Sequence, residues 1–291
     1  MNSLNILHIS DAHIQMATKE EVSEIVAKMV NDVLKVQKEQ KIKIHLVCFT
    51  GDLIQRGDKA MDDENQLEIA EEILINPVLN GLGLEKDKFI MVPGNHEVDV
   101  KKIVRATEKG LLVASLEEIN SNISEMNASY LARLDYFYQW IFNYYNDIIK
   151  ENIGYAFLRE MDGRKIGIAC IDSAWRSSGK GACEKGIMYV GQKQIIDLYK
   201  HIKDADVKIC LMHHPIGWLS EHESTIIKRE LTKFDIVLRG HVHENDHKEV
   251  CRQNMKTIYS TAGKLYPLDY TMGRAIDGLS LIHISEPTRR R

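Results

Sequence analysis

Residues 4–13 read LNILHISDAH, an apolar run that is followed at once by an acid and a histidine. A short run rich in Leu and Ile is typical of a strand buried on both faces of a sheet. The next stretch, residues 17–40, places apolar side chains at helical spacing, and Thr18 is a candidate N-cap. We therefore predict a strand, then polar side chains at its carboxyl end, then a helix.

The same order of elements recurs along the first third of the chain. Apolar runs at residues 44–50 (IHLVCFT) and 88–93 (KFIMVP) predict two further buried strands, and a polar helix is expected around residues 63–79. A β-α-β-α-β series of this kind is typical of a layered sheet with helical crossovers.

The middle of the chain, residues 99–152, is expected to be mostly helical. Its aromatic stretch, residues 136–145, either packs on the core or forms a lid that stacks on a ring of the substrate. The second half returns to short apolar runs that predict strands, with a helix around residues 192–202: YAFL, KIGIACID, VKICLMH, FDIVLRG and MKTIYST. The pattern predicts an α/β fold with either two sheets or one large mixed sheet.

Composition excludes several classes of protein. Of 291 residues, 44% are hydrophobic and 27% charged, so a sizeable core is available. The formal net charge of -4 gives no electrostatic footprint for nucleic acid or an anionic membrane. No CxxC pair, signal peptide or membrane-length apolar run is found, which favours a cytoplasmic protein without disulfides.

The C-terminus has a composition of its own. Residues 279–289 read LSLIHISEPTR, which looks like an in-frame translation of a sequencing adapter, and Arg290 and Arg291 follow. The alternative is a genuine basic tail. We expect a C-terminally truncated domain at residues 1–278 and a non-native tail at 279–291, so His283 is set aside as a ligand candidate.

Side chains that bind metals recur where the predicted strands end. They follow five strands in the segments SDAH, TGD, GNH, MHHP and GHVH: Asp11, His13, Asp52, Asn95, His96, His213, His214, His241 and His243. The carboxyl ends of strands in an α/β sheet meet at one edge. These side chains are therefore expected to lie close together.

The spacing of two pairs supports a shared site. Asp11 and His13 are two residues apart, as are His241 and His243. In an extended backbone, side chains at i and i+2 point the same way, so each pair would address one site. Glycines that would let the chain turn sharply stand beside these residues: Gly51, Gly94 and Gly240.

The mixture of carboxylate, amide and imidazole groups suits first-row metals such as Mn, Fe or Zn. The ligands are too many for one tetrahedral zinc, so two divalent ions are predicted. Two ions about 3.5–4 Å apart suit phosphoester hydrolysis, because they polarise the phosphoryl group and activate water. The chain lacks the G-x-S-x-G, G-x-x-x-x-G-K-[ST] and G-x-G-x-x-G motifs of serine hydrolases, P-loop NTPases and dinucleotide enzymes.

The ordered set D-x-H, G-D, G-N-H-[DE], H and G-H-x-H, from Asp11 to His243, resembles the calcineurin-like metallophosphoesterases. The forms SDAH, GNHE and GHVH are most similar to the cyclic-nucleotide phosphodiesterase-like branch. The resemblance implies a four-layer α/β/β/α sandwich of two mixed β-sheets flanked by helices. It also implies attack of a metal-bound hydroxide on a phosphodiester or phosphomonoester.

The resemblance further implies a role for each residue. The first metal would be held by Asp11, His13 and His243, the second by Asn95, His213 and His241, with Asp52 bridging both. His96 matches the histidine that protonates the leaving group or stabilises the phosphate. A neighbouring acid, Glu97 or Asp99, would orient it.

Two assignments stay open at this point. The family motif places the ligand first in HHP, which favours His213 and leaves His214 as a substrate contact. Arg56 stands where related phosphatases carry an arginine in GDxxDRG, although Gln55 replaces the acid. Arg56 either contacts substrate phosphate or is a solvated loop residue.

The predicted substrate is a small phosphoester, with a nucleotide as one candidate. Two alternatives are carried: a DNA-repair nuclease of the same superfamily, and a nucleotide-binding regulatory module fused to a C-terminal domain outside this sequence.

Overall fold

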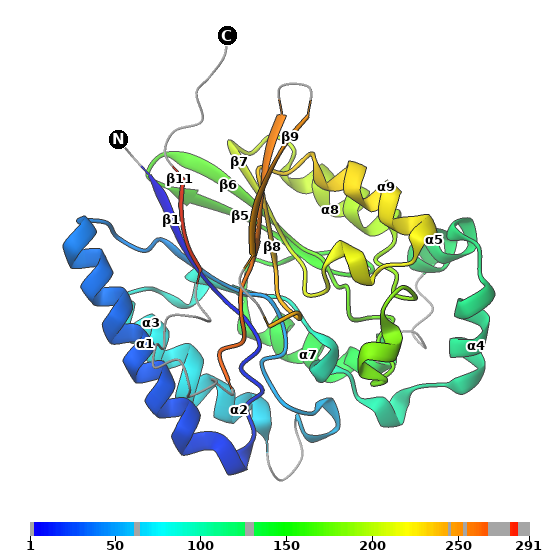
Figure 1. Ribbon diagram of the computed structural model, residues 1–291, viewed down its shortest axis with the longest axis horizontal. Helices are drawn as coiled ribbons and strands as arrows, with labels where there is room; N and C mark the ends of the chain where they lie inside the picture. The colour runs from blue at the N-terminus through cyan, green and yellow to red at the C-terminus, as the bar shows by residue number, and fades with distance from the viewer. Residues whose placement is uncertain are drawn as a thin grey trace.

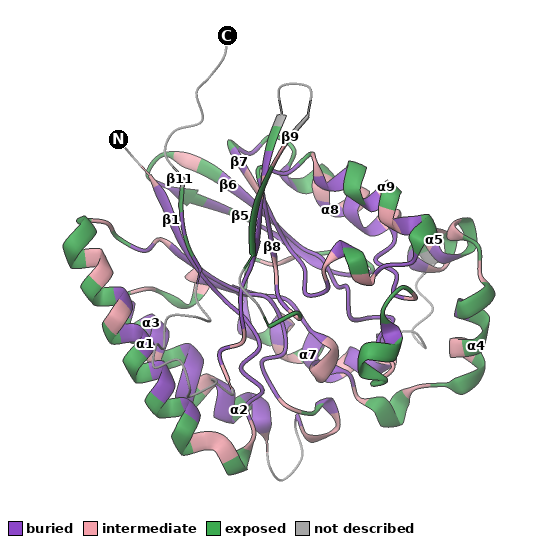
Figure 2. Cartoon of the chain, viewed as in Figure 1, coloured by how far each residue is buried: buried purple, intermediate pink, exposed green. Residues whose placement is uncertain are grey.

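The computed structural model describes residues 3–60, 65–125, 131–243, 246–252, 255–266 and 280–284. Two mixed sheets face each other, with helices on the outer side of each (Figure 1). Figure 2 shows that the strands are largely buried, whereas the outward faces of the helices are exposed. The predicted α/β fold with two mixed sheets flanked by helices is confirmed, and the single-sheet alternative is excluded.

The first sheet has four strands in the order β11-β1-β2-β3. Its parallel strands are β1 (Leu4–Ile9), β2 (Leu46–Phe49) and β3 (Phe89–Met91), and β11 (Ser280–Ile284) pairs antiparallel with β1. Every residue of β1, β2 and β3 is buried, because this sheet is covered on both faces.

The second sheet has seven strands in the order β4-β5-β6-β7-β8-β10-β9. Strands β6, β7, β8 and β10 run parallel, and the pairs β4–β5, β5–β6 and β9–β10 are antiparallel. The bounds are β4 (Ile149–Lys150), β5 (Tyr155–Met161), β6 (Arg164–Cys170), β7 (Val207–Leu211), β8 (Ile236–Arg239), β9 (Asp246–Arg252) and β10 (Met255–Thr261).

Helices close the sandwich on both sides (Figure 1). Beside the first sheet lie α1 (Lys19–Gln40), α2 (Gln66–Ala70) and α3 (Asn76–Leu82). Beside the second lie α8 (Gln192–Ile202) and α9 (Glu221–Leu231). The connection between the sheets contains α4 (Arg105–Val113), α5 (Leu116–Glu125) and α7 (Asp135–Tyr144). A five-residue π-helical stretch joins α2 to α3.

Helix α1 shows why the periodicity was informative. Its buried face carries Val22, Val26 and Met29 among other apolar residues, one helical turn apart, and the helix ends where Lys41 adopts a left-handed conformation. Thr18 occupies the N-cap position, but its hydroxyl donates to the Gln15 carbonyl at 3.3 Å instead of capping the helix. The predicted capping role of Thr18 is therefore wrong.

The aromatic helix α7 packs on the core. Its residues Tyr136, Phe137, Tyr138, Ile141 and Tyr144 are buried. The hydroxyl of Tyr138 donates to the buried Asp172 carboxylate at 2.8 Å, which satisfies a polar atom in the interior. The packing interpretation is confirmed for α7, and the lid interpretation is not.

Part of the segment predicted to be non-native lies in the first sheet as β11. Leu4, Ile6 and His8 pair in register with residues 284, 282 and 280. The pairing covers the edge of β1 but does not bear on the origin of residues 279–291, which stays a prediction.

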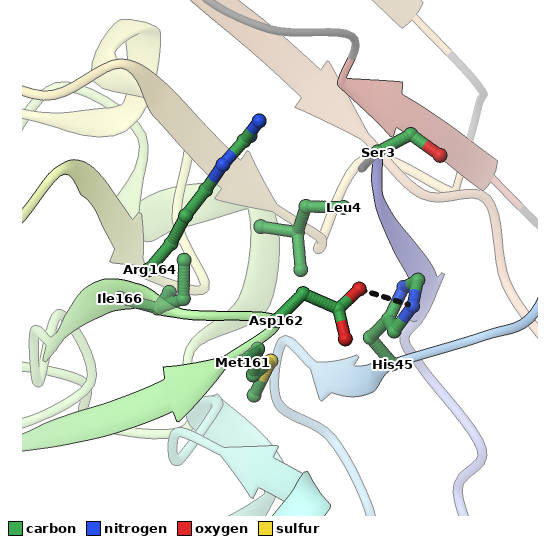
Figure 3. Close-up of a pocket in the computed structure, with 7 residues that line it drawn as sticks. All are labelled: Ser3, Leu4, His45, Met161, Asp162, Arg164 and Ile166. Atoms are coloured by element: carbon green, nitrogen blue, oxygen red, sulfur yellow. Dashed lines mark ion pairs between the residues drawn. The ribbon is translucent and has the colours of Figure 1, made fainter. Parts of the chain in front are cut away.

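The ends of the sheets away from the carboxyl termini of β1 and β2 are joined by an ion pair (Figure 3). His45 approaches Asp162, in the turn between β5 and β6, with 3.6 Å between Nε2 and Oδ2. The adjoining pocket of about 10 Å³, next to Leu4 and Ile166, has room for no more than about one water molecule. This pocket therefore offers no space for a larger ligand.

Two expectations from composition concern membrane spans and cysteines. No helix in the described part of the chain is both long enough and apolar enough to cross a membrane. Cys48, Cys170 and Cys210 are buried free thiols, and Cys183 is an exposed one.

Candidate metal centre

Five strands end at one edge of the sandwich, and each is followed by a predicted ligand. Asp11 follows β1, Asp52 follows β2, Asn95 follows β3, His213 follows β7 and His241 follows β8. Backbone hydrogen bonds hold the loops in register: the Asp11 N–H donates to the Gly51 carbonyl at 3.0 Å, and the Gly240 N–H to the His213 carbonyl at 3.1 Å. The convergence expected from the strand ends is thus present.

One group of side chains contains Asp11, His13 and His243. Their ligand atoms lie within 4.8 Å of one another. The Oδ1 atom of Asp11 is 3.3 Å from Nε2 of His243 and 3.9 Å from Nε2 of His13. That oxygen is buried and has no hydrogen-bond partner in the described structure, so it is available to a cation.

A second group surrounds the ring of His213. Its Nε2 atom lies 3.1 Å from Oδ1 of Asn95, 3.1 Å from Nδ1 of His241 and 3.3 Å from Oδ2 of Asp52. Asp52 also belongs to one group with Asp11 and His213 and to another with His13 and His96, so its carboxylate lies between the two sets of ligands.

The hydrogen bond at Nδ1 of His213 determines which ring nitrogen carries the proton. Nδ1 lies 2.6 Å from the Thr50 carbonyl oxygen, which accepts a hydrogen bond and so fixes the proton on Nδ1. Burial opposes a charge on the ring, but the Asp52 carboxylate prevails and raises the pKa of His213 to about 9. Burial likewise opposes ionisation of Asp52, yet His213 holds the pKa of that carboxyl well below its usual range. The site therefore favours positive charge beside Asp52.

The donor set fits divalent metal ions. With its Nδ1 proton held by the Thr50 carbonyl, His213 directs Nε2 at the oxygens of Asn95 and Asp52 and at Nδ1 of His241. A divalent ion bound there would take the place of the Nε2 proton that the Asp52 carboxylate stabilises. Ligand atoms about 2.1 Å from an ion and tetrahedrally arranged are about 3.4 Å apart, close to the separations found here.

The backbone at the ligands is not extended. Positive φ angles occur at Asp11 (56°), His13 (47°), Asp52 (57°), His241 (74°) and His243 (60°). This left-handed conformation is costly for residues other than glycine and concentrates at functional sites. The argument that each i, i+2 pair shares an extended backbone is therefore wrong. The turns instead place His243 next to Asp11 and His241 next to His213.

Gly94 and Gly240 allow neighbouring atoms to come close to the backbone, and they do not provide a sharp turn. A Cβ atom on Gly94 would lie 2.2 Å from Oδ1 of Asp52, and one on Gly240 would lie 2.0 Å from the Ser10 hydroxyl. Neither glycine has a positive φ, whereas Gly51 does, at 94°. The predicted sharp turn is found at Gly51 only.

His96 lies beside both groups of ligands. Its backbone N–H donates to Oδ1 of Asp52 at 2.9 Å, and its ring packs edge-on against the ring of His13 with centroids 4.5 Å apart. Nδ1 of His96 lies 2.8 Å from the Gln55 carbonyl oxygen. That carbonyl orients the ring, so the expectation that Glu97 or Asp99 does so is wrong.

Asp99 and Glu97 have other partners. The Asp99 carboxylate accepts the backbone N–H of Lys101 at 3.0 Å. Glu97 is fully buried and accepts the backbone N–H groups of Asp52 at 2.9 Å, Ile54 at 3.0 Å and Gly94 at 2.6 Å. Burial, reinforced by the Asp52 charge, raises the pKa of Glu97 to about 7. Through these hydrogen bonds the Glu97 carboxylate links the loop that follows β2 to the loop that follows β3.

Replacing Glu97 with Ala is expected to lower the free energy of unfolding by about 3 kcal/mol or more, because three buried N–H groups lose their acceptor. Urea unfolding followed by circular dichroism measures the change. The matched control is Glu24→Ala, at an exposed position of α1, for which a change within about 0.5 kcal/mol is expected. Equal loss in both variants would contradict the bracing role.

His214 is fully buried next to the ligands, with ring centroids 4.9 Å from His213 and 4.5 Å from His241. The Ser173 hydroxyl accepts the backbone N–H groups of His213 at 3.2 Å and His214 at 2.9 Å, so its own hydrogen points to Nδ1 of His214, 3.0 Å away. Burial, with the charges of His213 and His241, lowers the pKa of His214 well below its usual value. His214 is therefore neutral, with its proton on Nε2, an atom that lacks a partner among the described residues.

A pocket of about 210 Å³ opens beside His96. Asn95, Arg56 and Gly179 are among the residues that line it. The exposed Arg56 guanidinium donates to the Asp58 carboxylate from Nε at 3.0 Å and from Nη2 at 2.8 Å. Arg56 thus lies in an ion pair at the wall of this pocket, near His96.

Sequence reasoning missed several contributors. The carbonyls of Thr50 and Gln55, which orient two histidines, carry no signal in the residue types. Ser173 follows a predicted strand and was identifiable by that position alone. Trp218, whose ring stands perpendicular to His241 with centroids 4.0 Å apart, has no motif that marks it.

Comparison with known proteins is consistent with this geometry. A family model described as calcineurin-like phosphoesterase matches residues 4–245. An uncharacterised metallophosphoesterase-like protein of Bacillus subtilis (strain 168), YydB, is 24% identical over 274 residues, which cover 86% of this chain and 51% of YydB. The chain thus spans about half the length of that relative.

Solved structures were also compared. The purple acid phosphatase PPD1 of yellow lupin (Lupinus luteus) has 14% identity and a TM-score of 0.45, covering 89% of this chain and 44% of PPD1. The phosphopantetheinyl hydrolase of Mycobacterium tuberculosis has 13% identity and a TM-score of 0.44, covering 96% of each chain.

Proposed function

Because the chain belongs to the calcineurin-like phosphoesterase family, we propose that it is a hydrolase that cleaves phosphoester bonds with the aid of two divalent metal ions. The observation that carries the proposal is the convergence of acceptor atoms around His213 and around Asp11 at one edge of the sandwich. Such a set, with the carboxylates of Asp11 and Asp52 among its members, suits cations.

The proposed ligands fall into two sets that share one carboxylate. Asp11, His13 and His243 would hold one ion, Asn95, His213 and His241 the other, and Asp52 both. Ions of the Mn, Fe or Zn class suit this mixture of oxygen and nitrogen donors. When bound, two such ions would polarise the phosphoryl oxygens and make water a better nucleophile.

His96 would move a proton at Nε2. Its Nδ1 proton is held by the Gln55 carbonyl, which leaves Nε2 as the atom that exchanges protons with the leaving group. The contact of its backbone N–H with Asp52 keeps the ring next to the ligands. His96 also lines the pocket of about 210 Å³, where a leaving group has room.

The pocket suits a small phosphoester, with a nucleotide as one candidate from the phosphodiesterase-like motifs. Arg56 would contact an anionic oxygen of the substrate from the pocket wall while it stays paired with the Asp58 carboxylate. His214 would donate from Nε2 to an oxygen within the centre, because its full burial keeps it out of the open pocket.

The proposal is tested by hydrolysis of bis(p-nitrophenyl) phosphate and p-nitrophenyl phosphate. Activity is expected with Mn²⁺ and is expected to fall at least about a hundredfold after chelation, because the ions supply much of the charge stabilisation. The ratio of the two rates separates diesterase from monoesterase action.

Two outcomes would redirect the assignment. Metal-loaded protein that binds nucleotide without turnover of either ester would favour a regulatory module. Mn²⁺-dependent cleavage of single- or double-stranded DNA without turnover of the small esters would favour a nuclease.

A further inference from the structure

A second and larger pocket, of about 540 Å³, lies away from the ligand cluster on the second sheet. Its lining includes Ile216, Lys228, Arg239, Lys248, Val250 and Tyr259. Lys228 belongs to α9 and the last four to β8, β9 and β10, so the pocket lies between that helix and these strands of the second sheet. The outer strand β9 is exposed in Figure 2.

Strand register places the sheet residues of this pocket on one face. Tyr259 pairs with Lys248 of β9 and with Val237 of β8, and Thr261 pairs with Arg239. Residues opposite one another in register share a face, as do residues two apart along a strand. Val237 and Tyr259 pack in one apolar cluster with residues of α8 and α9, so this is the outer face of the sheet.

Arg239 is held in place before any ligand binds. Its guanidinium carbon lies 5.3 Å from the centroid of the Tyr259 ring, and Nη2 donates to the Thr261 hydroxyl at 3.0 Å. The Nε atom is buried and has no hydrogen-bond partner within the described ranges. A guanidinium fixed in this way loses little freedom when it binds an anion.

The pocket carries more positive than negative charge. Lys228, Arg239 and Lys248 line it and form no salt bridge with a carboxylate of the described residues, although the Asp246 carboxylate attracts the Arg239 guanidinium at longer range. One acid, Glu249, also lines the pocket, and its carboxylate pairs with Lys256 at 2.8 Å.

We propose that this pocket binds a phosphorylated small molecule of about nucleotide size, at a site separate from the metal centre. Three cations from three different elements match a phosphate or polyphosphate group, which arginine binds bidentately and lysine as a point charge. Ile216, Val250 and the Tyr259 ring supply apolar walls for the rest of the molecule. The volume lies in the range of small-molecule sites.

The test is calorimetric titration of the full chain with α,β-methylene-ADP, which resists hydrolysis, and with pyrophosphate. Binding of the nucleotide analogue is expected with metal loaded and also after chelation, because the pocket uses no metal. Lys248→Glu and Arg239→Gln are each expected to weaken that metal-independent binding at least about tenfold. Lys28→Glu, the same charge change at an exposed position of α1, is expected to leave it unchanged.

The outcomes separate this site from the hydrolytic one. Hydrolysis of bis(p-nitrophenyl) phosphate by Lys248→Glu is expected to equal that of the unaltered chain, because Lys248 is absent from the ligand groups. Nucleotide binding that vanishes on chelation, or that survives both pocket substitutions, overturns the proposal. Equal affinity for pyrophosphate and the analogue overturns the nucleotide-sized ligand, whereas tighter binding of the analogue supports it.

Discussion

Asp52→Ala is expected to abolish phosphoester hydrolysis, by at least about a thousandfold, and to empty the metal centre. Asp52 is buried, its Oδ2 atom lies 3.3 Å from Nε2 of His213, and it belongs to groups of ligand atoms on both sides of the cluster. Removal of this carboxylate takes away an acceptor from each proposed ion site and leaves the remaining charge insufficient for two cations.

Metal content per chain, measured by mass spectrometry after dialysis, checks this expectation together with the hydrolysis rate. Asp204→Ala, at an exposed turn position, is the matched control and is expected to retain both metal and activity. Asp52→Asn keeps the shape of the side chain without its charge, so it separates loss of charge from loss of packing. Full metal occupancy in Asp52→Ala would contradict the bridging role.

The local sequence was sufficient to predict that the ligands follow the ends of strands. A short apolar run is confined to the interior as a strand, so the first polar residue after it must lie at the edge of the sheet. This reasoning brought Asp11, Asp52 and His213 together, and the structure has them within 4.8 Å as one group. It also required that the two sheets pack with these ends together, because Asp11 and Asp52 follow strands of the first sheet and His213 follows one of the second.

Contacts that depend on distant parts of the chain were beyond the same reasoning. Gln55 orients His96 through a carbonyl, an atom that every residue carries. Glu97 follows the ligand Asn95 directly, yet its carboxylate turns inward to three N–H groups. A neighbour in sequence was taken for a neighbour of the His96 ring. Residues 95–97 instead form a short 3-10 helix, in which consecutive side chains point in different directions.

The pocket beside α9 illustrates the same limit. Lys248 and Arg239 lie on different strands, so only the register of β8, β10 and β9 shows that they share a face. Neither the strand β9 nor the helix α9 had been predicted. Exposed alternating strands and amphipathic helices next to them carry weak apolar signals.

His96→Ala is expected to lower kcat for phenyl or alkyl phosphoesters about 10²- to 10⁴-fold while the metal content stays unchanged. The ring is the proton donor in the proposed reaction, but it belongs to neither proposed set of ligands. The contact between residue 96 and Asp52 uses the backbone N–H, which alanine retains. His96→Ala should therefore lose activity but keep its metal ions, whereas Asp52→Ala should lose both.

The nature of the leaving group sharpens this test. If His96 protonates the departing oxygen from Nε2, its loss should matter little for p-nitrophenyl esters, which leave readily as anions, and much more for phenyl or alkyl esters. A purely structural role would lower all rates by the same factor. His222→Ala, on the exposed face of α9, controls for removal of an imidazole elsewhere. Equal metal loss in His96→Ala and Asp52→Ala would refute the division of roles, because both side chains would then be needed to hold the ions.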